Sequence, residues 1–197
     1  MLVLQPETPS GIAGVDEVGR GALFGPVVAA AVILMPNTEA TLFDLGVKDS
    51  KLLKVQQREA LVGPIKARAS GFAIGLASVH EIDRLNILQA SLLAMRRAIK
   101  RLAHPPSLCL IDGNQVIPGL EIPQKTLVKG DQTNITIASA SILAKVWRDT
   151  LIVRLDRRYP GYDLASNKGY GSPRHRQAIA NLGLSPQHRK SFRVSSS

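Results

Sequence analysis

The chain of 197 residues is long enough for one medium-sized domain with a small additional segment. Its 25 lysines and arginines against 15 aspartates and glutamates give a net charge of +10, which favours a polyanionic partner but suits an enzyme and a binding protein equally. One cysteine excludes a disulfide framework, and an aromatic content of 4% argues against a protein that stacks successive bases on rings. Since no signal-peptide pattern opens the sequence and the apolar run 27–35 is too short to cross a membrane, we expect a cytoplasmic protein.

The first predicted elements are two strands. Residues 1–10 are polar and lack periodicity, so we expect a flexible leader there. The small, apolar run 12–18 predicts a first strand, and the β-branched and alanine-rich run 27–35 predicts a buried second strand. Because Gly25-Pro26 marks a turn between them, we expect the two strands to pair antiparallel.

A loop, a helix and a third strand come next. Residues 47–51 are predicted to form a loop in which Ser50 caps a short turn. The pattern then indicates a helix over 55–69 and a strand over 70–78.

The middle of the chain predicts helices followed by two short strands. Ser78 and Glu81 have the spacing of a capping box, which starts a helical region ending near Leu102, ahead of a Pro-Pro pair. Apolar runs over 107–112 and 125–128 predict the two strands.

The last third of the chain is predicted to be mainly helical. A long helix is expected over 134–159, with apolar and polar side chains on opposite faces. A glycine-rich loop over 167–171 precedes a helix that Ser172 caps and that ends near Gly183.

This order of elements predicts an α/β protein whose mixed five-stranded sheet is flanked by helices. We expect a catalytic domain over 11–160, a C-terminal helical segment over 161–193 and a disordered tail over 194–197.

The stretch from Gly11 to Gly21 suggests a site. Asp16 and Glu17 stand where the first strand gives way to glycines, and Gly19 and Gly21 allow a tight turn with close backbone approach to a ligand. Arg20 between them suits phosphate recognition. Since neighbouring strand residues point to opposite faces, the two acids can share a site only if the strand ends or bends between them. Solvated turn residues explain the same pattern.

Two further acids point to the same place. Asp112 ends an apolar strand as Asp16 does, and the carboxyl ends of parallel strands lie at one edge of a sheet. Asp131 precedes the long helix near its positive end. Such carboxylates would repel one another unless a hard divalent cation, Mg²⁺ or Mn²⁺, lay between them. The alternatives are a turn residue at 112 and a helix cap at 131.

Six motifs in fixed order resemble the bacterial ribonuclease HII family, the type 2 ribonucleases H. The resemblance covers about residues 11–193. The motifs are Asp-Glu-Val-Gly-Arg-Gly (16–21), Lys-Asp-Ser-Lys (48–51), Ile-Asp-Gly (111–113), Lys-Gly-Asp (129–131), Ala-Ser-Ile-Leu-Ala-Lys-Val-Trp-Arg-Asp (140–149) and Asn-Lys-Gly-Tyr-Gly (167–171).

The resemblance implies an RNase H-like sheet and an endonuclease that hydrolyses the RNA strand of RNA–DNA hybrids and incises 5′ of ribonucleotides embedded in duplex DNA. It also implies Mn²⁺ or Mg²⁺ as cofactors, and we expect a monomer whose partners are these nucleic acids. Two ions would support attack of water on the phosphodiester, leaving a 5′-phosphate and a 3′-hydroxyl. The matching metal-binding and catalytic carboxylates are Asp16, Glu17, Asp112 and Asp131.

The resemblance also assigns substrate-reading residues. Gly19, Arg20 and Gly21 match a motif whose backbone senses the ribose 2′-hydroxyl, the group that distinguishes RNA from DNA. Tyr170 matches a tyrosine that packs on the deoxyribose following the ribonucleotide. A surface tyrosine in a turn is the structural alternative.

Polar residues around this pattern are candidate phosphate contacts, namely Lys51, Ser139, Lys145 and Arg148. An ordinary solvated helix face explains Lys145 and Arg148 equally well. The run Arg174-His175-Arg176 puts positive charge in the first turn of a helix, where the dipole disfavours it, and a nearby phosphate would offset that cost.

Two other functions remain open at this point. A nuclease of the same fold that acts on DNA alone would need no 2′-hydroxyl reader. A non-catalytic protein that binds RNA or hybrids would keep its acids for structure, and its binding would persist without divalent metal.

Overall fold

A mixed sheet of five strands forms the centre of the protein, in the order β3-β2-β1-β4-β5. The structure is a computed structural model that describes residues 11–193, so the leader expected over 1–10 and the tail expected over 194–197 lie outside the described residues. The strands are β1 (Ile12–Val18), β2 (Val27–Leu34), β3 (Ala69–Ala77), β4 (Leu108–Asp112) and β5 (Gln124–Leu127).

Strand direction divides the sheet into two halves. β1 pairs antiparallel with β2, which pairs antiparallel with β3, whereas β1, β4 and β5 run parallel. The parallel half requires crossover connections, and helices supply the one from β3 to β4. The predicted fold class and the antiparallel first pair are therefore confirmed.

Eight α-helices and one 3-10 helix are found in the described chain. Most agree with the predicted ranges within a few residues, but α1 and α7 were not predicted and α5 separates Asp131 from the long helix. They are α1 (Glu39–Asp44), the 3-10 helix η1 (Ser50–Leu52), α2 (Val55–Ala67), α3 (Val79–Leu85), α4 (Ile87–Lys100), α5 (Gly130–Thr133), α6 (Ile135–Asp156), α7 (Leu164–Asn167) and α8 (Pro173–Leu182). Within residues 11–193, none is both long and apolar enough to cross a membrane.

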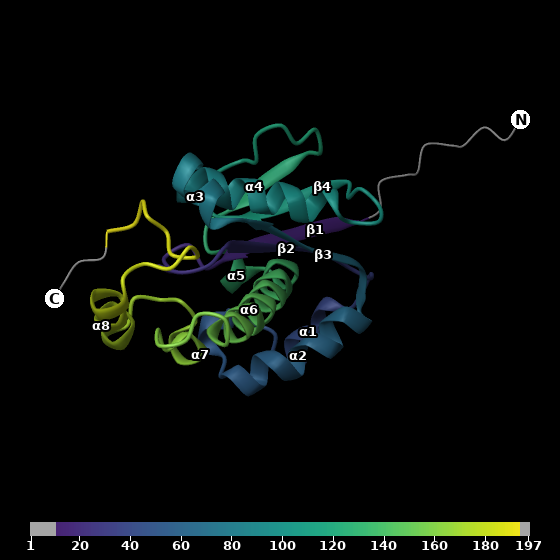
Figure 1. The fold of residues 1–197 in the computed structure, drawn as a ribbon. Coiled ribbons are helices and arrows are strands. Elements are labelled where there is room, and N and C mark those ends of the chain that lie inside the picture. Colours follow the sequence, from purple (N-terminus) through teal and green to yellow (C-terminus); the bar gives the residue numbers. More distant parts are fainter. Residues whose placement is uncertain (1–10, 194–197) are drawn as a thin grey trace, which may run out of the picture.

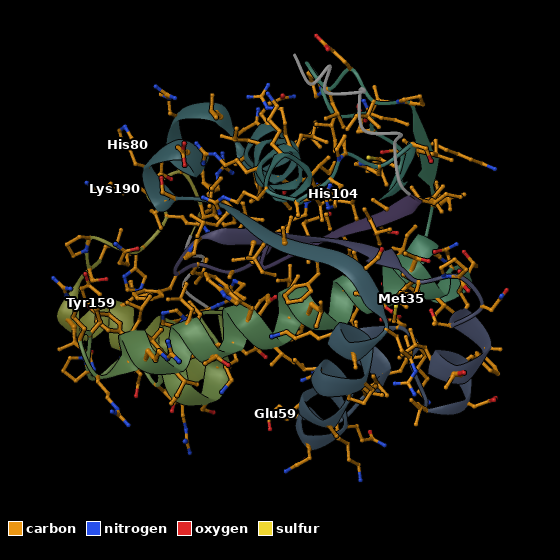
Figure 2. The ribbon with its side chains drawn as sticks, turned by 90° about the vertical axis from the view of Figure 1, so that its right-hand side faces the viewer. Met35, Glu59, His80, His104, Tyr159 and Lys190 are labelled. Atoms are coloured by element: carbon orange, nitrogen blue, oxygen red, sulfur yellow. The ribbon has the colours of Figure 1, made fainter. Side chains whose placement is uncertain are left out.

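Helices cover both faces of the sheet (Figure 1). α3 and α4 lie on one face, and α6 with α1 and α2 lies on the other. β2 is buried along its whole length because both of its faces are covered, which explains its uninterrupted apolar sequence. Side chains fill the layers on both sides of the sheet in the view of Figure 2.

Two glycines let a helix approach the sheet closely. A Cβ atom at Gly14 would lie 2.4 Å from the carbonyl carbon of Thr136 at the start of α6, and one at Gly75 would lie 2.1 Å from the carbonyl oxygen of Ala94 in α4. Any side chain at either position would force the helix away. The start of α6 is therefore held directly against β1.

The C-terminal part of the chain packs on the turn that follows β1. Leu23 and Phe24 from that turn share an apolar cluster with Ile152 of α6 and Ile179 of α8. Tyr162, between α6 and α7, belongs to the same cluster. The turn between the two antiparallel strands is thus covered by segments from the C-terminal part of the chain.

Candidate active site

The parallel pairing of β1 and β4 places the first two acids side by side. Val15 of β1 is in register with Ile111 of β4, so Asp16 and Asp112 are the next residues on neighbouring strands. Asp16 is buried at 5% exposure. The expectation that these two strands are parallel neighbours is confirmed, and it explains why Asp16 and Asp112 meet at one edge of the sheet. β1 does not end between Asp16 and Glu17, as a site shared by these two acids was expected to require, because the strand continues in regular pairing with β2 to Val18.

Asp131 joins this edge through backbone hydrogen bonds. Asp112 Oδ1 accepts from the backbone N–H of Gly130 at 2.7 Å and from that of Asp131 at 3.4 Å. The chain enters α5 through Lys129 in a left-handed conformation, and Asp131 is 3% exposed. Asn134, not Asp131, caps α6, since its side chain accepts from the N–H of Ile137. The helix-cap interpretation of Asp131 is therefore wrong.

Lys51 reaches the same acids from the loop between α1 and α2. Its ammonium group lies 3.1 Å from Asp131 Oδ2. The expected cap at Ser50 is wrong, because Asp49 caps η1 by accepting from the N–H of Lys51 at 2.9 Å. A cap belongs one residue before the first helical position, and Ser50 is already that first residue.

Ser50 instead faces Ser141 of α6. The two buried hydroxyl oxygens are 2.9 Å apart. Ser141 also forms a hydrogen bond with the carboxyl of Asp16, which acts to lower the pKa of that group. These contacts hold Asp16 from the helix side of the sheet.

Burial and mutual repulsion act on the acids together. The pKa of Asp16 lies well above its usual value, because the group is desolvated and has Glu17 and Asp112 nearby. Burial also raises the pKa of Glu17, against the opposing effect of Arg20, and burial with the charge of Asp131 raises the pKa of Asp112. A nearby cation would relieve this repulsion.

The donor set fits a hard divalent cation, since every candidate ligand is a carboxylate oxygen. Within residues 11–193, however, no three acid, histidine or cysteine side chains lie close enough to hold one ion together. Their oxygens have other partners: backbone N–H groups for Asp112, Lys51 for Asp131 and Arg20 for Glu17. To ligate a common ion, the carboxylates would have to turn from these partners.

The turn after β1 lies next to these acids. Gly19 has a φ of +89°, and a Cβ atom there would lie 2.1 Å from Arg148 Nε, so two independent constraints require glycine. A Cβ at Gly21 would meet no atom within 4 Å, which leaves this backbone open to an approaching ligand. Arg20 extends outward and pairs with Glu17 at 3.0 Å.

Tyr170 lies beside this turn. The carbonyl of Gly169 accepts from the N–H of Leu23 at 2.8 Å and of Phe24 at 3.2 Å, and Ala22 forms a β-bridge with Tyr170. The half-buried Tyr170 ring lies 5.5 Å from the ammonium of Lys145. The predicted turn and the predicted glycine-rich loop thus form one contiguous surface.

Three polar residues are not placed as the sequence suggested. Ser139 and Arg148 are both 0% exposed, and their polar atoms bond backbone carbonyls, so neither is available to a phosphate in this structure. His175 is also buried, where it bonds the carbonyl of Tyr170 and the ring of His188, and burial lowers its pKa. Lys145 is half-buried and pairs with Asp149 at 3.0 Å.

Arg189 is the residue beside the turn that sequence reasoning missed. Its guanidinium is 1% exposed and bonds the carbonyls of Gly19 and Arg20, each at 2.7 Å. The basic composition of the last residues gave no sign of this, because a lysine- and arginine-rich segment is usually solvated.

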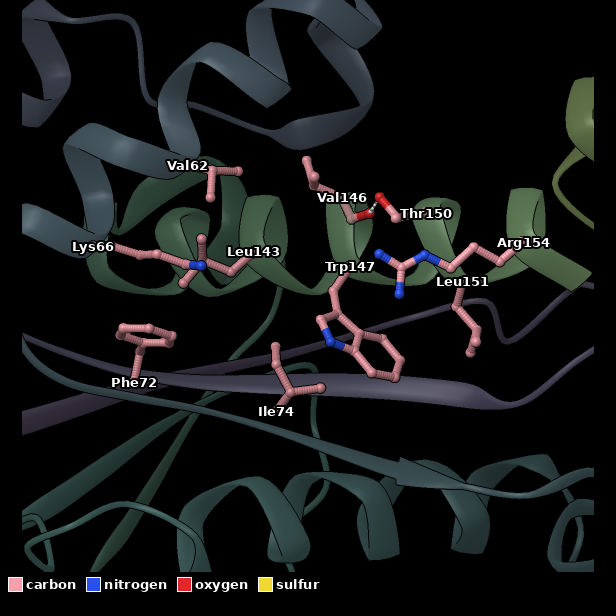
Figure 3. Close-up of a pocket in the computed structure, with 10 residues that line it drawn as sticks. All are labelled: Val62, Lys66, Phe72, Ile74, Leu143, Val146, Trp147, Thr150, Leu151 and Arg154. Atoms are coloured by element: carbon pink, nitrogen blue, oxygen red, sulfur yellow. Dashed lines mark hydrogen bonds between the residues drawn. The ribbon is translucent and has the colours of Figure 1, made fainter.

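A groove lies elsewhere, between α2, β3 and α6 (Figure 3). It measures about 410 Å³, and its floor is apolar, with Lys66 and Arg154 among its lining residues. None of the four acids lines it. The acids thus lie at the sheet edge and not in this groove.

Comparison with known proteins gives consistent results. The family described as Ribonuclease HII matches residues 13–195. Ribonuclease HII of Acaryochloris marina (strain MBIC 11017) is 67% identical over 181 residues, 92% of this chain and 91% of that protein. Ribonuclease HII of Trichodesmium erythraeum (strain IMS101) is 62% identical over 180 residues, 91% of this chain and 85% of that protein. The crystal structure of the ribonuclease H2 from Pyrococcus horikoshii OT3 matches with a TM-score of 0.78 at 28% identity, covering 93% of this chain and 94% of that one.

Proposed function

Since the chain belongs to the ribonuclease HII family and is a ribonuclease H that cleaves the RNA strand of RNA–DNA hybrids, we propose that it also incises duplex DNA at embedded ribonucleotides. The proposed cut is 5′ of the ribonucleotide and leaves a 5′-phosphate and a 3′-hydroxyl. The chemistry is attack of water on the phosphodiester with the help of divalent metal.

The metal-binding and catalytic residues in this proposal are Asp16, Glu17, Asp112 and Asp131. Mg²⁺ or Mn²⁺ bound by such oxygen ligands lowers the pKa of water and neutralises charge that develops on the phosphate. The observation that carries the proposal is the β1–β4 register, which makes Asp16 and Asp112 neighbours while Asp131 bonds back to Asp112.

The backbone of Gly19 to Gly21 is the proposed reader of the 2′-hydroxyl. The hydroxyl can donate and accept a hydrogen bond, so a close backbone group can distinguish ribose from deoxyribose. The open space beside Gly21 would permit that approach. Tyr170, across the β-bridge from Ala22, would pack on the next sugar and so register a step from RNA to DNA.

Exposed cations complete the proposed substrate surface. Lys51 has a side chain that is 77% exposed, and Arg20 one that is 48% exposed, so both can reach a phosphate while remaining close to the acids. Lys145, beside the Tyr170 ring, is the third candidate.

The test is cleavage of a duplex that contains one ribonucleotide, with product ends mapped, in Mg²⁺, in Mn²⁺ and in EDTA. The proposal expects a single metal-dependent cut with a 3′-hydroxyl, and no cut in the all-DNA duplex. Equal cleavage of all-DNA duplex would favour a DNA nuclease of the same fold. Binding in EDTA without cleavage in either metal would favour a non-catalytic binding protein.

A further inference from the structure

Two arginines are buried together behind the turn that follows β1. Arg148 comes from α6 and Arg189 from the segment after α8, and their side chains are 0% and 1% exposed. Both hydrogen-bond to backbone carbonyls. They lie close enough for the charge of one to act on the other, as the pKa of Arg189 indicates.

Their hydrogen bonds hold both ends of the turn. Arg189 donates to the carbonyls of Gly19 and Arg20, each at 2.7 Å, and to that of Gly25 at 3.0 Å. Arg148 donates to the carbonyls of Phe24 at 3.0 Å and Pro26 at 3.1 Å.

Arg148 also connects this turn to the loop that carries Tyr170. It donates to the carbonyl of Lys168 at 2.9 Å, and its guanidinium lies 5.4 Å from the Tyr170 ring. The same side chain occupies the space beside the Gly19 α-carbon, where a Cβ would be 2.1 Å from Nε. One guanidinium therefore contacts both of the proposed substrate readers.

Burying two like charges side by side is unfavourable. Desolvation, with the charge of Arg148, lowers the pKa of Arg189 to about 9, and desolvation lowers that of Arg148. Apolar side chains of similar volume often stabilise a protein more than buried charged groups do. Stability alone thus does not account for this pair, whereas a planar fork of donors suits the task of fixing several carbonyls at once.

We propose that Arg148 and Arg189 are positioning residues that set the selectivity for isolated ribonucleotides, by fixing the Gly19–Gly21 backbone at a defined distance from Tyr170. The proposal rests on the proposed function, in which these two elements read consecutive sugars. Neither arginine touches the substrate. Their effect is on the spacing between the two readers, while Asp16 and Asp112 are held separately by the strand register.

The test compares two substrates with one enzyme preparation. We would measure kcat/KM for a duplex with a single ribonucleotide and for a continuous RNA–DNA hybrid, in the wild type and in Arg148→Lys and Arg189→Lys. Lysine keeps the charge but has no planar fork, so it cannot hold several carbonyls in the same geometry. We expect the ratio of the two values to fall about tenfold, on the scale by which misplaced binding groups weaken selectivity.

This ratio is insensitive to partial unfolding, because unfolded molecules are lost equally from both reactions. Arg97→Lys is the matched control: Arg97 also bonds a backbone carbonyl, that of Leu76, and pairs with Glu81 away from the turn. Its ratio should equal that of the wild type. A ratio that stays at the wild-type value in both turn variants, with the two rates lowered in parallel, would overturn the proposal.

The two proposals fail in different ways. If the wild type does not cleave the single-ribonucleotide duplex at all, the proposed function falls and this inference falls with it. If the wild type cleaves it selectively and the two lysine variants keep that selectivity, only the positioning role falls. Arg189→Met removes the donors altogether and should lower the ratio further than Arg189→Lys does.

Discussion

The two halves of the candidate site are built in different ways. The acids lie in the last part of β1, at the end of β4 and on α5, where the β1–β4 register and hydrogen bonds between sequence motifs place them. The turn at Gly19–Gly21 and the Tyr170 loop have irregular backbone, fixed by buried side chains from α6 and from the chain end. The first half follows from regular secondary structure, and the second depends on tertiary contacts across more than 100 residues of sequence.

The largest effect on activity is expected from a substitution in the acidic half alone. In Asp112→Asn we expect cleavage to fall by at least about 10²-fold, because the side chain loses the negative charge with which it would hold a divalent cation in the proposed site. Substrate affinity should change little, since phosphate contacts carry most of it. Single-turnover cleavage and a binding isotherm measure the two quantities. Asp44→Asn, at an exposed position on α1, is the control; a parallel loss of binding would contradict this assignment.

A smaller effect on activity is expected from a substitution in the half formed by the Gly19–Gly21 turn and the Tyr170 loop. Tyr170→Ala should reduce the preference for an RNA-to-DNA junction about tenfold, the scale of one lost stacking contact. Tyr170→Phe keeps the ring and should keep the preference. The comparison uses cleavage rates on junction and continuous hybrid substrates. An unchanged preference in Tyr170→Ala would remove this residue from the site.

Lys51 pairs with Asp131 of the acidic half and should affect substrate binding only through its charge. Lys51→Gln should lower the salt dependence of substrate binding by about 0.9 in the slope of log K against log salt, the value for one phosphate contact on B-form DNA. Filter binding over a range of salt concentrations measures this slope. Lys48→Gln, at an exposed position three residues earlier, controls for net charge and should leave a steeper slope than Lys51→Gln. Equal slopes in the two variants would refute the contact.

The smallest effect concerns stability and should leave both halves unchanged at neutral pH. Arg97 lowers the pKa of Glu81 from 4.5 to about 2. A carboxyl whose pKa is lowered by folding stabilises the folded state at any pH above its ordinary pKa. This contribution is lost as the pH falls from 4.5 towards 2. Glu81→Gln should therefore flatten the decline of stability in that window.

Urea midpoints at pH 7 and pH 3 measure this effect. The difference between the two midpoints should be smaller in Glu81→Gln than in the wild type, while exposed Glu59→Gln should behave as the wild type. A changed substrate preference in Glu81→Gln would mean that α3 influences the readers. The route would be Asp83 of α3, which accepts hydrogen bonds from Lys190 and Ser191 beside Arg189.

The acidic half could be predicted from the sequence because its acids lie on or next to strands that hydrophobic periodicity reveals. Alternating and apolar runs located β1 and β4, and the chemistry of parallel strands then predicted that Asp16 and Asp112 meet. The polar residues of α6 were harder to interpret, since the helical spacing of Lys145 and Arg148 equally describes a solvated face. That face is covered by the turn and by the C-terminal segment, which no local pattern of residues 134–159 reveals.

The smaller errors of prediction arose where neighbouring residues give similar or weak sequence signals. Asp49 and Ser50 are both good helix caps, and only the position of the first helical residue decides between them. The short α1 lacks a side-chain cap and buries a single residue, so its sequence signal is weak. His175 was grouped with two arginines as surface charge, yet its partner His188 lies 13 residues away and is buried as well.

The contacts that α6 makes with β1 and with the turn after it recur at regular intervals. Gly14 meets Ile137, Asp16 meets Ser141, and Gly19 meets Arg148. From Gly14 to Asp16, two residues of strand advance about 6.6 Å, and from Ile137 to Ser141, four residues of helix advance about 6 Å. Seven further residues complete nearly two full turns of the helix and bring Arg148 to the turn at Gly19. One face of α6 therefore follows the chain from Asp16 to the turn at Gly19. Deleting one residue of α6 between 141 and 148 would rotate Arg148 by about 100° and leave each half intact but out of phase with the other.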